Sequence, residues 1–311
     1  MLIKTFKQLS KKDVSIAGGK GASLGEMTQA KIPIPDGFVI LASAFNKFLE
    51  ETDLNIEIEA KLHKVNLKNI NSINQTSNEI MDLILDAEFP KDIVREILKE
   101  FSKLKVSYVA VRSSATAEDS SVASWAGELE SYLNTTKNNL LENIKKCWAS
   151  LFTSRAIFYR FEKKLNGTKN SVAVVIQKMI QSKIAGICFT VHPVTKDYDQ
   201  MIIEAGYGLG EAIVGGKITP DTYVVHKKNK NILDKNINRQ EKMIIKSKGG
   251  NLEKRVLKSK QQKQKLNDRQ ILKLAEICKK IETHYKIPQD IEWVFAKDKF
   301  YIVQSRPITT L

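Results

Sequence analysis

The sequence contains little cysteine and no long apolar run. Its 311 residues include three cysteines, which stand far apart along the chain: Cys147, Cys188 and Cys278. This number and spacing form neither a disulfide framework nor a zinc-binding pattern, so we expect a reducing compartment, the cytoplasm. No stretch of about 18 apolar residues occurs, so no membrane-spanning helix is expected. The N-terminal segment has no continuous apolar region and is typical of mature protein rather than of a signal peptide.

Histidines are also few. The four present are His63, His192, His226 and His284, and none lies in a Gly/Ser/Thr-rich loop beside a second catalytic group. We interpret them as structural or surface residues. The sequence has no HExxH motif, and no Ser-His-Asp set is evident, so the metal-dependent and serine-dependent hydrolases that use them are not indicated.

Positive charge is in excess, with 50 Lys and Arg residues against 35 Asp and Glu residues, a formal net charge of +15. A basic chain can bind nucleic acid, anionic membranes or nucleotide phosphates. The densest segment, Lys227 to Lys265, is mixed with Asn, Gln and Glu, and it has few aromatic side chains to stack on bases. We therefore interpret the charge as a compositional preference for Lys and Asn, and nucleic-acid binding is not expected as the main function.

The pattern of apolar residues indicates a mixed fold. Hydrophobic residues make up 42% of the chain, enough for a sizeable core in two or more lobes. Residues 43–101 are expected to be mainly helical, and a spacing of three or four predicts one long helix over residues 138–164. Asn267 and Gln270 form a capping pair for a helix over residues 268–284. Short apolar segments predict strands at residues 38–41, 108–111, 172–176, 185–189, 201–204, 223–226, 291–295 and 300–304. This order predicts an α+β fold with mostly antiparallel sheets.

Two segments in the first half are suited to binding an anion. Gly18 to Met27 begins Gly-Gly-Lys-Gly, so backbone N–H groups can approach a phosphate and Lys20 can supply a point charge. Its spacing differs from a Walker loop, and a plain turn remains the alternative. Arg112 directly follows a predicted buried strand and opens a Ser/Thr/Gly loop that extends to Gly127. Such a loop suits a polyphosphate, although a solvated Ser-rich loop is also compatible.

Two further segments lie in the second half. In the segment Gly206 to Glu211, glycine occupies every second position, but the continuation of a dinucleotide fingerprint is lacking, so we reject a Rossmann fold. A tight turn is the alternative interpretation, and Glu211 could still contact a ribose. The two closing strands carry Glu292, Gln304 and Arg306. Glu292 and Gln304 can share a face only if opposed residues sum to an even number, which requires an odd-length loop or a bulge. Together they could bind Mg²⁺ on a nucleotide, and a buried Glu–Arg pair is the alternative.

Taken together, these segments resemble the N-terminal nucleotide-binding region of the phosphoenolpyruvate synthase and pyruvate phosphate dikinase family. The match spans nearly the whole chain. The Arg112 motif and Gln304-Ser305-Arg306-Pro307 are its most specific parts. The segments that match in kind and order are Gly18 to Met27, Ile32 to Phe38, Ala110 to Asp119, Ala123 to Gly127, Tyr132 to Asn134, Gly206 to Glu211 and Asp290 to Pro307.

The resemblance implies an ATP-grasp-like fold in which two lobes clamp ATP. An N-terminal lobe over residues 1–170 would bind the phosphates, and a C-terminal lobe over residues 171–311 would carry the adenine hinge and the Mg²⁺-binding strands. By the same resemblance, Lys20 and Arg112 hold the phosphates and Arg306 contacts the γ end, which makes these three the expected catalytic residues.

The remaining site residues are also implied by the resemblance. Glu292 and Gln304 would bind Mg²⁺. Adenine would lie beside the hinge strand at Gln177 and Met179, and Glu211 is the candidate for the ribose. ATP and Mg²⁺ are therefore the expected cofactors.

The resemblance also concerns partners. Family members phosphorylate a histidine on a swivelling domain and pass the phosphate to an acceptor on a barrel domain. The sequence to Leu311 contains neither, so both are expected in trans or in a further segment. The overall reaction would convert ATP, pyruvate and water to phosphoenolpyruvate, AMP and phosphate. Relatives that phosphorylate rifamycin antibiotics or glucans share the ATP module, so the acceptor stays open, as does a non-catalytic nucleotide-binding paralogue.

Overall fold

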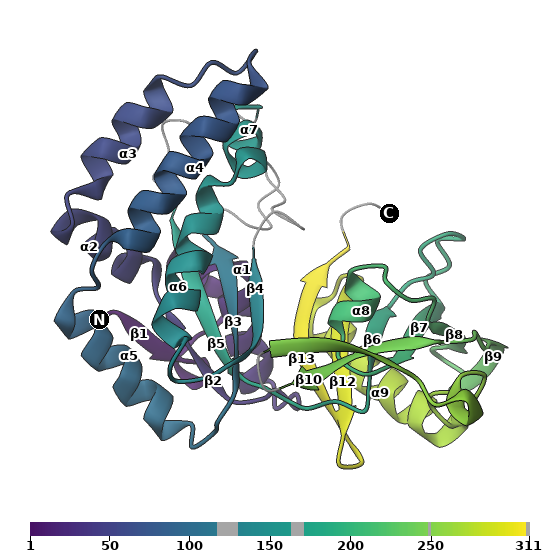
Figure 1. Ribbon diagram of the computed structural model, residues 1–311. Coiled ribbons are helices and arrows are strands. Elements are labelled where there is room, and N and C mark those ends of the chain that lie inside the picture. Colours follow the sequence, from purple (N-terminus) through teal and green to yellow (C-terminus); the bar gives the residue numbers. More distant parts are fainter. Residues whose placement is uncertain (117–129, 163–170, 248–249, 309–311) are drawn as a thin grey trace. The chain divides into compact units, whose positions relative to one another are not determined.

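The chain folds into two compact units, whose helices and strands are labelled in Figure 1. The computed structural model describes residues 1–116, 130–162, 171–247 and 250–308. The first unit comprises Met1–Glu26 and Asp36–Met179, and the second comprises Met27–Pro35 and Ile180–Leu311. Every strand pair within the described residues is antiparallel, which confirms the α+β prediction.

The first unit is built on a five-stranded sheet in the described residues. Its strand order is β1 (Ile3–Thr5), β2 (Gly37–Ile40), β5 (Val172–Lys178), β3 (Val109–Ala115) and β4 (Ser131–Thr135). The expected division at residue 170 therefore falls just before a strand of the first sheet, because β5 pairs with both β2 and β3. Its apolar sequence fits this central position, since neighbouring strands and packed layers surround it.

Helices cover one face of this sheet, and α1 (Val14–Gln29) lies on the other. The covered face contributes alternate residues such as Val109, Val111 and Ile176 to the core, where they meet Trp148 of α6 (Leu140–Ala149). Val39 points the opposite way and lies close to Gly21 of α1. The remaining helices of the unit are α2 (Ala42–Glu51), α3 (Leu54–His63), α4 (Ile70–Asp86), α5 (Lys91–Lys103), α6 (Leu140–Ala149) and α7 (Ser154–Glu162).

The single helix predicted over residues 138–164 is wrong, because the chain forms α6 and α7 with a 3₁₀ turn at Ser150–Phe152 between them. The Ser150 hydroxyl donates to the Cys147 carbonyl oxygen at 2.8 Å, and Thr153 Oγ1 accepts from the Ala156 N–H at 3.2 Å, which starts the new helix. Apolar spacing continues through the break, so periodicity alone does not reveal it.

The second unit contains a six-stranded sheet, again counting described residues. Its order is β13 (Lys299–Pro307), β12 (Gln289–Ala296), β6 (Ile184–Phe189), β7 (Gln200–Tyr207), β8 (Asp221–His226) and β9 (Asn231–Asn236). Helix α9 (Asp268–Tyr285) packs against this sheet, and Asn267 and Gln270 form the expected capping box at its start. The short helix α8 (Glu211–Val214) follows β7, and β10 (Lys242–Ser247) pairs with β11 (Gly250–Arg255).

A fully buried ion pair anchors the connection that leads into α9. Lys265 Nζ lies 2.7 Å from Asp221 Oδ1, and both side chains are 0% exposed. The Tyr223 hydroxyl donates to the other carboxylate oxygen at 2.8 Å, and the Lys265 N–H does so at 2.9 Å. These contacts satisfy the buried charges, so the connection is fixed to Asp221, the first residue of β8.

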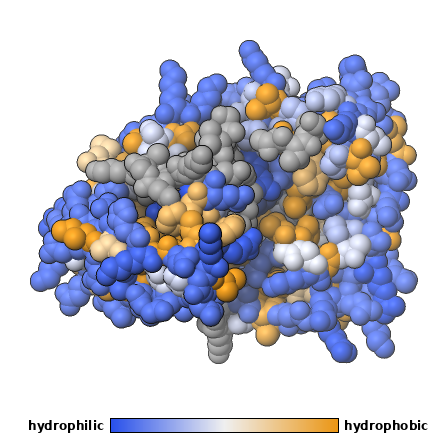
Figure 2. All heavy atoms as spheres, turned by 90° about the horizontal axis from the view of Figure 1, so that it is seen from above, coloured by the Kyte–Doolittle hydropathy of each residue, from blue (hydrophilic) through white to orange (hydrophobic). Residues whose placement is uncertain are grey.

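The surface is largely hydrophilic. Hydrophilic residues cover most of the face drawn in Figure 2, and apolar residues appear on it in smaller groups. Exposed large apolar side chains are scattered along the sequence, as at Ile56, Val194 and Leu257. Many of the Lys side chains pair with single carboxylates, as Lys235 does with Asp268 at 2.5 Å. This pattern agrees with an excess of Lys spread over the chain.

Candidate functional site

Lys20 lies in the first turn of the main segment of α1. The helix is interrupted at Gly18, which has φ +69° and ψ 170°, so the regular segment begins at Gly19. The Gly-rich stretch is thus helical after the Gly18 break rather than a free turn. A helix N-terminus carries a partial positive charge and N–H groups without partners in the helix, which suits an anion.

Strand β3 supports this segment through Ser114. The Ser114 hydroxyl accepts from the Gly21 N–H at 3.2 Å and donates to the Ala17 carbonyl oxygen at 2.9 Å. Ser113 and Ser114 are fully buried within β3, so the expected loop at residues 112–127 begins later than predicted. The rest of that motif, from Ala117 through Glu118 and Asp119 to Gly127, lies outside the described residues.

Arg112 and Gln177 share the face of the first sheet against which α1 lies. Arg112 pairs with Val175, and Ala110, two residues earlier, pairs with Gln177. Directly paired residues of adjacent strands point to the same face, and every second residue does too. Ser114 follows Arg112 by two residues and contacts α1, which identifies that face. The first unit therefore brings Lys20, Arg112 and Gln177 to one side of its sheet.

Gln177 carries an unsatisfied buried donor. Its side chain is 2% exposed, and within the described residues its Nε2 has no hydrogen-bond partner. Leaving a buried amide unpaired costs about 1–3 kcal/mol, so such a group points to a missing acceptor. Met179, at the end of the first unit, donates its N–H to the Tyr108 carbonyl oxygen at 3.1 Å, which fixes the chain just after β5.

Glu292 and Gln304 are directly paired across β12 and β13 in the second unit. The two strands are joined by a two-residue turn, Lys297 and Asp298, both with positive φ, which is typical of a type I′ hairpin. That turn alone would oppose Glu292 to Val303. A bulge between Glu292 and Trp293 shifts the register by one residue and places Gln304 opposite Glu292. Of the two arrangements that would let Glu292 and Gln304 share a face, an odd-length loop or a bulge, the structure therefore has the bulge.

Arg306 is held by Asp290, a residue that the sequence analysis did not assign to the site. The guanidinium Nε donates to Asp290 Oδ2 at 2.9 Å, and Nη2 lies 2.8 Å from the same oxygen. Burial raises the pKa of Asp290 above its ordinary value, against the lowering effect of the Arg306 charge. Asp290 precedes Glu292 by two residues, so strand alternation could have found it.

Glu204 of β7 is a second acidic residue missed from the sequence. It pairs with Ile187, which in turn pairs with Glu292, so all three side chains point to one face of the second sheet. Burial raises the pKa of Glu204, and the Asp290 charge adds to this effect. No sequence signal identifies it, because the contact depends on the strand order β12, β6, β7. The second unit therefore gathers three of its carboxylates, those of Glu204, Asp290 and Glu292, on one face with Gln304 and Arg306.

Glu211 begins α8 directly after the Gly206–Gly210 segment. Its carboxylate accepts from Asn251 Nδ2 at 2.5 Å and lies 3.5 Å from Lys217 Nζ. A Cβ placed on Gly210 would lie 3.6 Å from that of Ala185, which pairs with Val294 and so belongs to the Glu292 face. The start of α8 is thus close to that face within the second unit.

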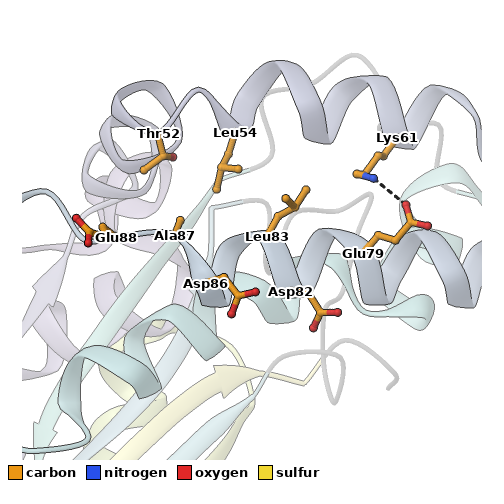
Figure 3. Close-up of a pocket in the computed structure, with 9 residues that line it drawn as sticks. All are labelled: Thr52, Leu54, Lys61, Glu79, Asp82, Leu83, Asp86, Ala87 and Glu88. Atoms are coloured by element: carbon orange, nitrogen blue, oxygen red, sulfur yellow. Dashed lines mark hydrogen bonds and ion pairs between the residues drawn. The ribbon is translucent and has the colours of Figure 1, made fainter.

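A separate hollow of about 720 Å³ lies between α3 and α4 in the first unit (Figure 3). Its lining consists of Thr52, Leu54, Lys61, Glu79, Asp82, Leu83, Asp86, Ala87 and Glu88, and none of the expected site residues is among them. The single amine, Lys61, donates a hydrogen bond to Glu79 at 2.8 Å and thereby lowers the pKa of that carboxyl. The other carboxylates make this hollow unsuited to a polyphosphate.

The described residues form neither a dedicated metal cluster nor a membrane-spanning helix. No group of three or more His, Cys, Asp or Glu side chains in the described part is arranged to hold a metal ion. A Mg²⁺ ion on a nucleotide needs only one or two protein groups, since phosphates and water supply the rest. Among the same residues, no helix has both the length and the apolar character needed to cross a membrane.

The family model and the relatives of this chain each match nearly its whole length. The family model described as "Pyruvate phosphate dikinase, AMP/ATP-binding domain" matches residues 14–311. A probable phosphoenolpyruvate synthase of Methanocaldococcus jannaschii is 44% identical over 99% of this chain and 27% of its own length. The phosphoenolpyruvate synthase of Pyrococcus furiosus is 39% identical over 99% of this chain and 44% of its own length.

A relative of a different name matches equally well. The rifampicin phosphotransferase of Bacillus subtilis is 39% identical over 100% of this chain and 36% of its own length. The chain therefore spans between 27% and 46% of the length of these curated relatives, and the upper value belongs to a probable phosphoenolpyruvate synthase of Methanothermobacter thermautotrophicus. Those relatives contain further segments beyond the one that this chain matches.

Proposed function

Because this chain belongs to the family of pyruvate phosphate dikinase AMP/ATP-binding domains, we propose that it is the ATP-binding module of a phosphoenolpyruvate synthase type enzyme. In this role it transfers phosphate from ATP to a histidine on a separate swivelling domain. The observation that carries the proposal is the similarity over nearly the whole chain to relatives named phosphoenolpyruvate synthase. The module is an ATP-grasp-like fold in which the two units act as lobes that clamp the nucleotide.

In the first unit, Lys20 and Arg112 bind the phosphates. Lys20 lies in the first helical turn of α1, where the partial charge of the helix adds to that of the ammonium. Arg112 projects from a central strand, so a rigid element aims its guanidinium. Gln177 offers the adenine a buried amide donor that lacks a partner within the described residues. Met179 directly follows the same strand and makes the hinge contact.

In the second unit, Glu292 and Gln304 hold Mg²⁺. Their oxygens belong to directly paired residues, and carboxylate and amide oxygens are ligands that suit this hard cation. Mg²⁺ would supply charge neutralisation on the phosphate oxygens. Arg306, oriented by Asp290, contacts the γ end, and Glu211 contacts the ribose.

Phosphoryl transfer requires little covalent chemistry from these residues. The transition state spreads negative charge over the phosphoryl oxygens, so catalysis comes from positioning and from cationic groups. The nucleophile is a histidine of another domain, and the expected net reaction converts ATP, pyruvate and water to phosphoenolpyruvate, AMP and phosphate. That domain and the pyruvate-binding domain are proposed partners, supplied by segments such as those that the longer relatives contain.

Loss of the Arg112 guanidinium provides the first test. In Arg112→Ala we expect MgATP affinity to fall by about 10- to 150-fold, since a hydrogen bond to a charged group contributes about 1.5–3 kcal/mol. Isothermal titration calorimetry on the 311-residue chain measures this loss. The control is Arg95→Ala, which removes the same charge from the exposed face of α5 and should bind normally. Unchanged affinity in Arg112→Ala would refute the proposed phosphate contact.

A rifamycin phosphotransferase is the second candidate, favoured by the 39% identity to the Bacillus subtilis relative. The ATP module is shared, so the acceptor separates the two. The chain, MgATP and the complementary segments of each relative are mixed with pyruvate or with rifampicin. Pyruvate-dependent formation of phosphoenolpyruvate supports the leading proposal, and phosphorylation of rifampicin alone supports the second.

A further inference from the structure

We propose that Ser114 is a positioning residue for nucleotide binding, because its hydroxyl caps the start of α1 from a neighbouring strand and thereby fixes the backbone of Lys20. The inference rests on the proposed function, in which Lys20 contacts a phosphate. Ser114 itself is assigned no contact with the nucleotide.

The cap differs from an ordinary one in its origin. In most helices the N-cap residue supplies a side-chain oxygen that accepts from the second or third helical N–H. Here the cap position is Gly18, which has no side chain, and the third N–H of the regular segment belongs to Gly21. Ser114 Oγ accepts from that N–H at 3.2 Å. A strand therefore provides the oxygen that the helix cannot provide for itself.

The same hydroxyl holds the chain on the other side of Lys20. It donates to the Ala17 carbonyl oxygen at 2.9 Å, so one atom joins the residues three before and one after Lys20. The site has no spare room, since a Cβ on Gly18 would lie 2.2 Å from Ser114 Oγ. Both hydrogen bonds are buried, and Ser114 is 0% exposed. The backbone around Lys20 can thus adopt few alternative positions.

Ser114 also links the two phosphate-binding residues of the first unit. Arg112 lies two residues earlier on β3 and on the same face, so one strand carries both the guanidinium and the cap. The position of Lys20 relative to Arg112 is then set by a single strand-to-helix junction. Small displacements of such groups reduce binding strongly, which gives the junction a functional effect beyond stability.

The neighbouring Ser113 offers a matched control. It is also 0% exposed, but it points to the other face, where its hydroxyl donates to the Cys147 carbonyl oxygen at 3.2 Å and lies 3.1 Å from Ser150 Oγ. Ser113→Ala and Ser114→Ala each remove one buried hydroxyl from adjacent positions of β3. Only the second removes the cap of α1.

The experiment measures MgATP affinity by calorimetry and stability by urea unfolding on the same samples of the 311-residue chain. For Ser114→Ala we expect MgATP affinity to fall by about tenfold. This ratio lies within the range obtained when the free-energy cost of losing a helix cap is converted to a ratio of affinities. For Ser113→Ala we expect lower stability with unchanged affinity. Wild-type affinity in a folded Ser114→Ala chain overturns the proposal. If that variant does not fold, Ser114→Cys fills the site with a thiol, which is too weak an acceptor and donor to replace the two hydrogen bonds, so affinity should again fall and wild-type affinity there overturns the proposal equally.

A double-mutant cycle with Lys20→Ala separates this inference from the proposed function. If Ser114 acts through Lys20, adding Ser114→Ala to Lys20→Ala should weaken MgATP binding by less than about twofold, because coupled residues are not additive. A full further tenfold loss overturns the positioning role while leaving the phosphate contact of Lys20 intact. Lys20→Ala that binds like wild type instead refutes the contact of Lys20 itself.

Discussion

Replacing Gly18 by alanine should destabilise the first unit strongly. Gly18 has φ +69° and ψ 170°, a combination that residues with a Cβ rarely adopt. An added Cβ would also lie 2.2 Å from Ser114 Oγ and 2.3 Å from the Ser114 carbonyl oxygen. The second of these atoms belongs to the backbone of a central strand, so it cannot move away without disturbing the sheet.

The expected cost follows from two separate terms. The backbone conformation costs about 1–3 kcal/mol for a residue other than glycine. Inserting a methyl group into a packed site costs about 1–3 kcal/mol more. Alanine regains about 0.4–1 kcal/mol because it restricts the unfolded chain. The free energy of unfolding should therefore fall by about 2–5 kcal/mol, a large part of the 5–15 kcal/mol that is usual for a domain.

Urea unfolding followed by tryptophan fluorescence gives this difference by linear extrapolation. Gly216→Ala is the control, because Gly216 also has positive φ, +63°, yet an added Cβ would meet nothing within 4 Å. It should show only the backbone cost, about 1–2 kcal/mol. If Gly18→Ala costs no more than Gly216→Ala, the close approach between α1 and β3 is not real and the reasoning fails.

Two other predictions concern buried charges in the second unit. Lys265→Met leaves the fully buried Asp221 without its cation and should lower the free energy of unfolding by about 3–5 kcal/mol. Adding Asp221→Asn should recover part of that loss in the same urea titration, and no recovery would show that the ion pair is not the cause. Glu204→Gln tests the pH dependence of stability. Burial raises the folded-state pKa of Glu204 above its unfolded value. The protonated carboxyl therefore contributes stability below the unfolded pKa, and this stability is lost as the pH rises through the folded-state pKa. The Gln variant should therefore gain stability over the wild type at pH 7 and not at pH 4, and an equal difference at both values would contradict the burial of this carboxyl.

Local signals explain what the sequence could predict of the fold. The capping box at Asn267 and Gln270 lies within four residues and was found correctly. The strand alternation of β12 and β13 was likewise sufficient to place Glu292, Gln304 and Arg306 on one strand pair. Such features depend on residues that are close together in the sequence, so they can be predicted without knowledge of tertiary contacts.

Tertiary contacts explain what was missed. Ser113 and Ser114 belong to a Ser-rich segment that favours a loop, but each hydroxyl finds a partner in a packed helix, which permits both to lie in a buried strand. Glu204 reaches the Glu292 face only through the order of the strands in the second sheet. The roles of the site residues toward ATP and Mg²⁺ remain predictions that the binding experiments test.

The capping of α1 by a distant strand has a consequence for synthesis on the ribosome. Ser114 is 93 residues from Gly21, and β3 joins β2 only through β5, which ends at Lys178. An emerging chain that does not yet reach Lys178 cannot complete the sheet that presents Ser114 to the helix. The geometry around Lys20 is therefore completed only after the residues through Lys178 have left the exit tunnel.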